Sequence, residues 1–121
     1  MIKAVIFDLD NTLIDFMTMK RISCDAAITA MIDAGLNVDK EKAMKELFSL
    51  YDKYGMEKRS IFQILLKKLT KKIDYKILAS GIVAYRRVRT GFLEPYPHVI
   101  DVLFELKKRG IKLAIVSDAP R

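Results

Sequence analysis

Two short apolar runs stand near the two ends of the chain, and each predicts a buried strand. Residues 2–8 form the first run, which ends in an acid, and residues 111–116 form the second. Neither run alternates between apolar and polar positions, which favours strands of a parallel sheet that is covered on both faces.

Between these runs, from about Phe16 to Gly91, apolar residues recur at helical spacing in four successive groups. The pattern predicts four amphipathic helices that can bury a small core together. In helix order, the expected core positions are Cys24, Ala27, Ile28 and Met31; Ala43, Leu47, Leu50, Tyr51 and Tyr54; Ile61, Leu65 and Leu69; and Leu78, Ile82 and Tyr85.

Capping residues mark the ends of these helices. Asp39 and Asp74 can each accept a hydrogen bond from a free N–H group of a first helical turn. Ser60 and Gln63 have the spacing of a capping box for the third helix. Gly55 follows the second group and is expected to end its helix.

A proline-containing link, E-P-Y-P at residues 94–97, separates the four helices from one more helix. This helix is expected to begin at Pro97 and to end at Gly110. Its expected buried residues are Val99, Val102, Leu103 and Leu106. The strand–helix–strand order implies parallel strands joined by a right-handed crossover. The fold class is therefore α/β, with a parallel sheet that is incomplete in this chain, because two strands alone do not make a stable sheet.

Composition is that of a globular protein. The chain has 121 residues, of which 51% are hydrophobic and 31% charged, so intrinsic disorder is excluded. The sequence contains no apolar run long enough to cross a membrane, and the first run is too short for a signal peptide. The single cysteine, Cys24, cannot form an internal disulfide, which predicts that the protein is located in the reducing cytoplasm.

Positive charge is concentrated in one part of the chain. Ten basic and two acidic residues lie between Glu57 and Arg89, so this stretch carries +8 of a chain whose net charge is +7. Such a stretch is typical of a solvated helix face, of a surface that steers phosphorylated substrates, or of a nucleic-acid contact. Phe62, Tyr75 and Tyr85 accompany the charges at spacings that fit a helix core, and no nucleic-acid motif is visible.

Two carboxylates follow the first strand. Asp8 and Asp10 are two residues apart, so in an extended chain their side chains leave on the same side. Ligands of open α/β sheets bind outside the carboxyl ends of the strands. There, two carboxylates can hold Mg²⁺, one can attack phosphorus, and the other can serve as general acid and base. A bare Asp-x-Asp pair is weak evidence for such a site, because it is more typical of an acidic strand end that faces solvent.

The residues around this pair resemble a known family. The segment D-L-D-N-T-L-I-D at residues 8–15, after the strand V-I-F, closely resembles the first signature motif of the haloacid dehalogenase superfamily, DxDxT followed by an apolar residue. The segment V-S-D-A-P at residues 116–120 resembles the second motif, in which a Ser or Thr at a strand end binds the phosphoryl group. The resemblance implies a Rossmann-like core at residues 1–15 and 93–121, with an inserted four-helix cap at residues 16–92.

The resemblance also implies a role for each matching residue. Asp8 would be the nucleophile and a metal ligand. Asp10 would be the general acid and base, and it would bind the metal through its backbone carbonyl. Ser117 would donate a hydrogen bond to the phosphoryl group, and Asn11 and Asp118 are candidates to offer backbone N–H groups. The implied cofactor is Mg²⁺, and the implied reaction is phosphate-ester hydrolysis through an aspartyl-phosphate.

The family's third motif, a lysine, and its fourth, an acidic cluster, follow the second motif and are absent from this sequence. We therefore expect the 121-residue chain alone to be inactive. The remaining C-terminal part of the same protein, or a second copy, is expected to complete the sheet. The expected substrate is a small phosphorylated metabolite such as phosphoglycolate or a sugar phosphate, and no membrane or nucleic-acid partner is expected.

Three alternatives remain at this point. A haloacid dehalogenase has the same fold, but it does not keep the second aspartate of the first motif, so Asp10 favours phosphoryl transfer. A phosphomutase shares both the motif and the helical cap. A basic binding module without enzymatic activity is the alternative from another functional class.

Overall fold

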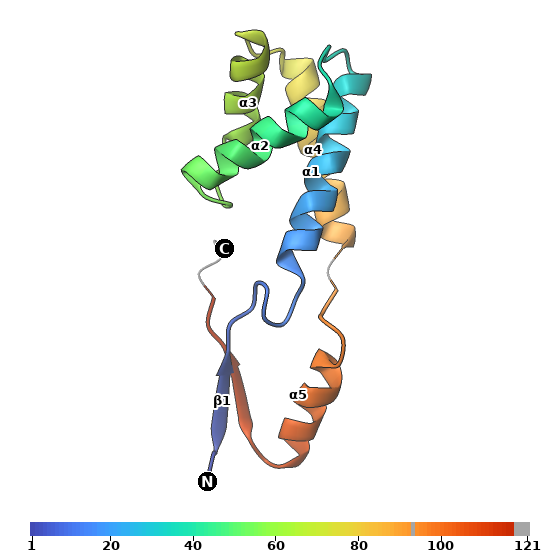
Figure 1. The fold of residues 1–121 in the computed structure, drawn as a ribbon. Helices are drawn as coiled ribbons and strands as arrows, with labels where there is room; N and C mark the ends of the chain where they lie inside the picture. The colour runs from blue at the N-terminus through green and yellow to red at the C-terminus, as the bar shows by residue number, and fades with distance from the viewer. Residues whose placement is uncertain (93, 118–121) are drawn as a thin grey trace. The chain divides into compact units, whose positions relative to one another are not determined.

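The structure is a computed structural model that describes residues 1–92 and 94–117. Figure 1 shows its elements along the chain. In order, these are β1 (Ala4–Phe7), α1 (Phe16–Asp33), α2 (Lys40–Tyr54), α3 (Ile61–Thr70), α4 (Tyr75–Gly91), α5 (Val99–Lys108) and β2 (Lys112–Ile115). The predicted order of strand, four helices, helix and strand is confirmed.

The chain divides into two compact units. The helical unit is Lys20–Gly91, and the sheet unit combines Met1–Met19 with the segment from Phe92 onward. Among the described residues, no helix combines the length and the apolarity that a membrane span needs.

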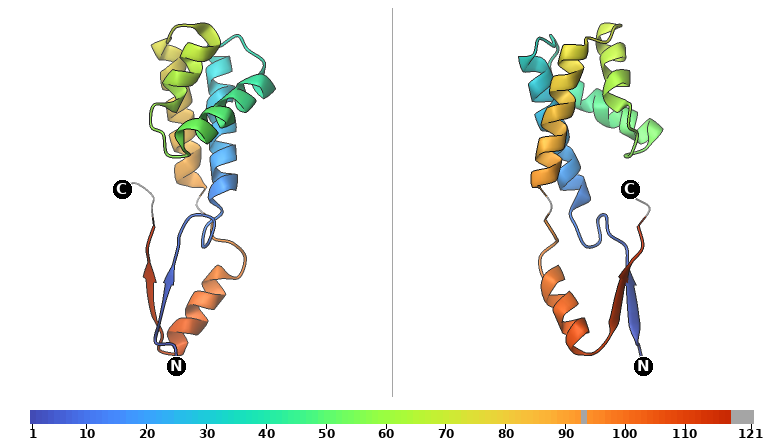
Figure 2. Two further views of the ribbon diagram at one scale, coloured as in Figure 1. Left: turned by 60° about the vertical axis from the view of Figure 1, so that its left-hand side comes forward. Right: turned by 180° about the vertical axis from the view of Figure 1, so that it is seen from behind.

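The sheet unit contains two parallel strands in the order β1-β2. Their register pairs Val5 with Leu113 and Phe7 with Ile115. The helix α5 packs against β2 and provides the crossover between the strands. Figure 2 shows the paired strands with α5 from two further sides. The prediction of a parallel α/β unit is confirmed.

Large apolar surfaces of the sheet unit stay exposed. Ile6 is 68% exposed, Ile115 is 56% and Val116 is 65%. The described residues thus fail to bury the strands on both faces as the sequence predicted, which agrees with an incomplete core. On α5, Val99, Leu103 and Leu106 are half-buried. The prediction that four residues of α5 are buried is therefore wrong, because none of them is fully buried and Val102 is 49% exposed.

The helical unit has a continuous apolar core. Cys24, Ala27, Ile28 and Met31 are fully buried, as predicted, and Leu47 and Leu65 lie in the same cluster. Burial raises the pKa of the Cys24 thiol to about 11, so this cysteine is a core residue rather than a reactive nucleophile.

Two of the aromatic residues placed in this core lie outside it. Tyr54, in the last turn of α2, is 45% exposed. Tyr75, in the first turn of α4, is 75% exposed. Phe62 and Tyr85 do pack together, with ring centroids 5.5 Å apart in an edge-to-face arrangement. Helical spacing therefore placed Phe62 and Tyr85 correctly and failed for Tyr54, the last residue of α2, and for Tyr75, the first residue of α4.

Two of the three predicted N-terminal caps are present. The Asp39 carboxylate accepts from the Lys42 N–H at 3.1 Å, and that of Asp74 accepts from the Lys76 N–H at 2.9 Å. The capping box at Ser60 is wrong, because the Ser60 side chain makes no capping bond. Its backbone, at φ −94° and ψ 24°, lies outside the extended region that directs a cap side chain to the N–H groups.

The start of α5 also differs from its prediction. The helix begins at Val99 rather than Pro97, because His98 has a left-handed backbone with φ of 69°. Pro97 instead lies in the turn that precedes the helix.

Candidate active site

A tight turn follows β1 and sets the positions of the two candidate aspartates. The Leu9 carbonyl accepts hydrogen bonds from the N–H groups of Thr12, Leu13 and Ile14, at 3.3, 2.9 and 3.2 Å. Asn11 enters the left-handed region with φ of 59°, which asparagine tolerates better than most residues. The chain thus reverses within a few residues of the strand end.

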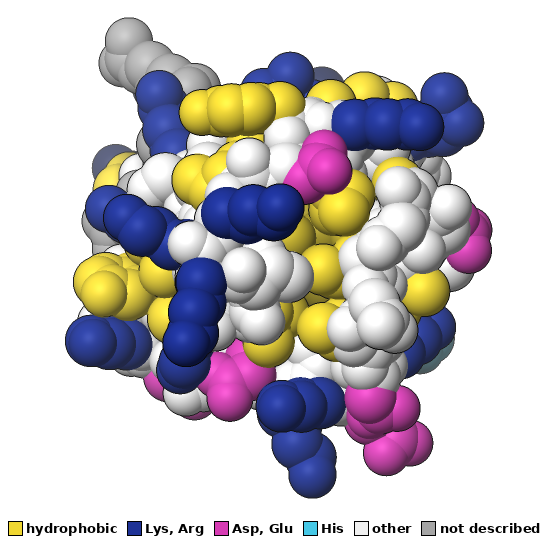
Figure 3. All heavy atoms as spheres, turned by 90° about the horizontal axis from the view of Figure 1, so that it is seen from above, with side chains coloured by type: hydrophobic (Ala, Val, Ile, Leu, Met, Phe, Trp, Pro, Cys, Tyr) yellow, Lys and Arg dark blue, Asp and Glu magenta, His cyan; other side chains and the backbone are white. Residues whose placement is uncertain are grey.

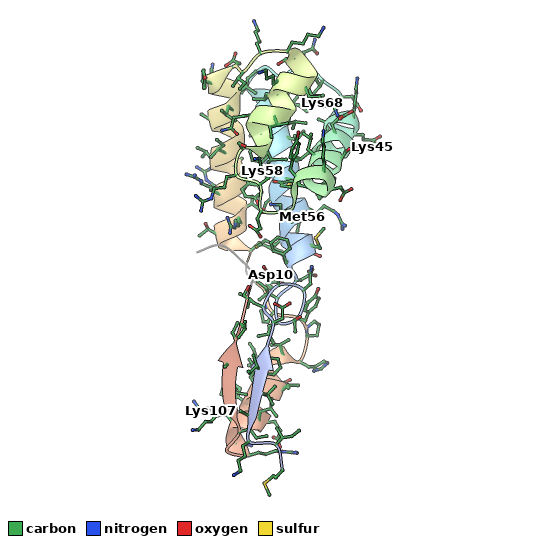
Figure 4. All side chains as sticks on the ribbon, turned by 90° about the vertical axis from the view of Figure 1, so that its left-hand side faces the viewer. Asp10, Lys45, Met56, Lys58, Lys68 and Lys107 are labelled. Carbon is green, nitrogen blue, oxygen red and sulfur yellow. The ribbon has the colours of Figure 1, made fainter. Side chains whose placement is uncertain are left out.

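Asp8 is the first residue after β1, and its side chain is exposed. The Thr12 hydroxyl donates a hydrogen bond of 3.3 Å to the Asp8 carboxylate. Asp10 is half-buried and is labelled in Figure 4, where it lies beyond the carboxyl end of β1. A carboxylate that is exposed at a strand end and steadied by one hydroxyl is accessible to a phosphate group or a cation.

Asn11 is held by bonds within the turn. Its N–H donates to the Ile14 carbonyl at 2.9 Å, and its side-chain oxygen accepts from the Met17 N–H at 3.1 Å. If Asn11 offers this N–H group to a ligand, as the sequence suggested, the bond to Ile14 has to be exchanged for the new one.

The second strand ends beside the first. The Val116 N–H donates to the Phe7 carbonyl at 2.9 Å, which continues the pairing beyond β2. Asp8 and Ser117 each follow this last paired position, and Ser117 is exposed. The two strand ends therefore bring an aspartate and a serine to one edge of the sheet. Asp118 lies outside the described residues.

Residues 94–96 are hydrogen-bonded to the turn that follows β1. The Tyr96 N–H donates to the Leu13 carbonyl at 2.9 Å, and the Asp15 N–H donates to the Glu94 carbonyl at 3.3 Å. The Asp15 carboxylate caps α1 by accepting from the Thr18 N–H at 3.1 Å. The pKa of the Tyr96 phenol is raised above its ordinary value. Desolvation is the largest cause, followed by the negative charge of Asp15 and by a hydrogen bond with the Asp15 side chain.

Sequence reasoning did not single out Asp15 or Tyr96. The capping role of Asp15 could have been found, because it is an aspartate directly before a helix. The contact with Tyr96 could not, because it joins segments about eighty residues apart.

The residues at this edge fit a magnesium ion only in part. Within residues 1–92 and 94–117, no group of three or more acidic, histidine or cysteine side chains could hold a metal. Asp8 and Asp10 nevertheless supply the hard oxygen donors that Mg²⁺ prefers, and this ion commonly binds through one or two carboxylates together with water and phosphate oxygens. The pair can thus supply part of a coordination shell.

The whole chain matches a family model. Residues 2–121 match the model of the haloacid dehalogenase-like hydrolases. A glyceraldehyde 3-phosphate phosphatase of Methanocaldococcus jannaschii is 42% identical over 118 residues, which are 98% of this chain and 52% of that protein. A protein of the same name from Pyrococcus abyssi is 36% identical, over 98% of this chain and 50% of its own length.

A solved structure shows a similar fold. It is that of a predicted phosphoglycolate phosphatase from Haemophilus somnus, with a TM-score of 0.55 and 20% sequence identity. The match covers 98% of this chain and 52% of that one. The chain thus spans about half the length of the relatives that it matches.

Proposed function

The chain belongs to the haloacid dehalogenase-like hydrolases, and from this premise we propose that the whole protein is a magnesium-dependent phosphatase of small phosphorylated metabolites. The observation that carries the proposal is the position of Asp8. It follows β1 directly, is exposed, and lies beside the strand end that carries Ser117. The names of the related phosphatases support the same reaction class.

In the proposed reaction, Asp8 and Asp10 have separate tasks. An Asp8 carboxylate oxygen attacks the phosphorus atom while the bond from phosphorus to the substrate oxygen breaks. Asp10 gives a proton to the departing oxygen, which leaves as an alcohol. Asp10 then removes a proton from a water molecule, whose oxygen attacks the phosphorus and frees Asp8 and inorganic phosphate.

Other residues would hold the phosphoryl group during both steps. The Ser117 hydroxyl is suited to donate to a phosphoryl oxygen from the neighbouring strand end. Thr12 would keep the Asp8 carboxylate oriented, as its hydroxyl does at 3.3 Å. Asp8 and the Asp10 carbonyl would hold Mg²⁺, which supplies charge neutralisation for the phosphoryl oxygens when bound.

Glyceraldehyde 3-phosphate is the first substrate to test, because five related proteins carry its phosphatase as their name. Phosphoglycolate and sugar phosphates come next. In this proposal the helical unit is the cap, and the lysine and acidic groups absent from this chain come from another polypeptide segment. The free and buried Cys24 supports a cytoplasmic location.

The test is turnover by the full-length protein. Glyceraldehyde 3-phosphate, phosphoglycolate, an aryl phosphate and a 2-haloacid are each offered with Mg²⁺, with Ca²⁺ and with excess chelator. We expect phosphate release with Mg²⁺ only, and inhibition by Ca²⁺, because its looser coordination disturbs in-line attack. Halide release in the presence of chelator would instead establish the dehalogenase alternative.

A further inference from the structure

Lys20 places a charged group inside the helical unit. Its side chain belongs to α1, and the residue is only 5% exposed. The ammonium group donates hydrogen bonds of 2.8 Å to the Met56 carbonyl and of 2.8 Å to the Tyr85 hydroxyl. One nitrogen thus connects α1, the segment between α2 and α3, and α4.

Two aromatic rings surround this nitrogen. It lies 4.2 Å from the centroid of the Tyr51 ring and 5.2 Å from that of Tyr85. Cations are attracted to such ring faces, most strongly where water is excluded. Burial lowers the pKa of the Lys20 ammonium and raises that of the Tyr85 phenol to about 12. Tyr85 therefore stays neutral and can accept the bond from Lys20.

The Met56 carbonyl belongs to a short loop, residues 55–60, between α2 and α3. Gly55 begins the loop with φ of 94°, and its N–H donates to the Tyr51 carbonyl at 2.8 Å. The loop, together with Tyr54, lines an open hollow of about 620 Å³. Figure 4 labels Met56 and Lys58 on this loop.

The hollow has a positive lining. Lys58 and Arg59 are both exposed along it, against one acid, Glu57. The Lys58 ammonium lies 5.8 Å from the centroid of the Tyr54 ring, which keeps it close to the loop. The side chains that can attract an anion are thus carried by the same loop whose backbone Lys20 holds.

We propose that Lys20 is a positioning residue, whose buried ammonium fixes the 55–60 loop so that Lys58 and Arg59 are held ready for the anionic part of a phosphorylated ligand. The choice of ligand rests on the proposed function. The fixing of the loop is independent of the proposed function, because it follows from the contacts of Lys20. A buried ammonium is costly unless it is well paired, so its contacts resist displacement of the loop.

The test uses the full-length protein and a Lys20→Met variant, which keeps an unbranched side chain that is one atom shorter and removes the charge and the donors. Hydrogen exchange at the bonded amides of the loop, those of Gly55 and Lys58, should become about tenfold faster or more, as expected when a bond to a charged group is lost. Amides in the middle of α2 and α3 should change less. Lys45→Met, an exposed substitution on α2, is the matched control and should leave the loop unchanged.

Kinetics give a second measurement. With glyceraldehyde 3-phosphate, Lys20→Met should raise KM several-fold while kcat stays within about a factor of two, because the residue orders a binding loop and not the reacting atoms. Equal acceleration of exchange in the loop and in the helix interiors would show a purely structural role and overturn the proposal.

A further variant keeps the proposal testable if Lys20→Met does not fold. Lys20→Arg preserves the charge, but its planar guanidinium cannot reproduce the same pair of bonds. Loop exchange should again be faster than in the unchanged protein. Unaltered exchange in a folded variant of either kind would overturn the role of Lys20. An inactive full-length protein would remove only the kinetic measurement, so the two proposals can fail separately.

Discussion

The Val116 N–H donates a hydrogen bond of 2.9 Å to the Phe7 carbonyl, so the two strands stay paired up to the residues that precede Ser117 and Asp8. This bond fixes which side chains share the end of the sheet. A nucleophile and a phosphate-binding hydroxyl are useful only if they are close, and parallel pairing brings both to one edge.

The first prediction concerns Asp8. Asp8→Asn should abolish turnover of an aryl phosphate by the full-length protein, because the amide cannot replace the attacking carboxylate. Folding should be preserved, since the side chain is exposed and its hydrogen bond with Thr12 is long, at 3.3 Å. Phosphate release and thermal unfolding are measured together. Asp101→Asn, at an exposed position on α5, serves as the control. Retained activity in Asp8→Asn would remove this residue from the mechanism.

The second prediction separates Asp10 from Asp8. Asp10→Asn should lower kcat by roughly 10²–10⁴-fold, because the leaving group then departs without a proton. Magnesium affinity should fall less than in Asp8→Asn, since the proposed contact of Asp10 is through its carbonyl. Titration calorimetry of Mg²⁺ with the two variants gives the comparison. A greater loss of affinity in Asp10→Asn would show that its side chain is the ligand.

Much of the fold was predictable because local signals and tertiary structure agree. Asp39 and Asp74 directly precede helices, and Cys24 to Met31 repeat at helical spacing, so sequence was enough. The errors lie where tertiary structure decides. Ser60 has the residue type of a cap without its backbone angles, and Val102 lies on α5 where the described residues leave it 49% exposed.

At the candidate site, sequence could place the residues but not their contacts. The predicted carboxyl ends of the two strands were enough to place Asp8 and Ser117 at one edge of the sheet. The bond from the Asn11 N–H to Ile14 and the contact of Asp15 with Tyr96 depend on the path of the turn, which spacing does not reveal. The position of Lys20 was likewise hidden, because its partners come from two distant segments.

The third prediction concerns a close contact in the helical core. A Cβ atom on Gly81 would lie only 2.2 Å from Cε of Met31, a fully buried side chain. Gly81→Ala should therefore destabilise the protein by about 1–3 kcal/mol, less the gain of up to about 1 kcal/mol from better helix propensity. Chemical denaturation measures the change. Gly91→Ala is the control, since a Cβ there meets nothing within 4 Å, and it should be neutral or slightly stabilising.

The fourth prediction concerns the basic surface of the helical unit, where Lys and Arg side chains are prominent in Figure 3. Reversing Lys67, Lys71 and Lys72 to Glu should lower kcat/KM for a phosphorylated substrate more at low salt than at high salt, if the surface steers substrate. The screening length falls from about 30 Å at 0.01 M salt to about 10 Å at 0.1 M. Lys68 is left unchanged because it pairs with Glu46 at 2.8 Å. A salt profile equal to that of the unchanged protein would identify these lysines as a solvated surface.

The fifth prediction concerns the open face of the sheet. Ile6 is 68% exposed and Val116 is 65% exposed, although both belong to a strand or its end. Related proteins are about twice as long as this chain. We therefore predict that a further polypeptide segment covers this face in the full-length protein. Residues 1–121 alone should then self-associate, because exposed apolar faces and open strand edges attract one another.

Substitution of Ile6 distinguishes a covered face from a truly open one. If a further segment covers it, Ile6→Lys should destabilise the full-length protein by at least about 1.5–3 kcal/mol, the value of burying one large apolar side chain. In residues 1–121 alone, the same change should reduce self-association, because the lysine points into water. Ile22→Lys, on the partly exposed side of α1, is the control and should have a small effect in both. An Ile6→Lys full-length protein of unchanged stability would mean that the face stays in solvent, and that the sheet is completed along its edges without being covered there.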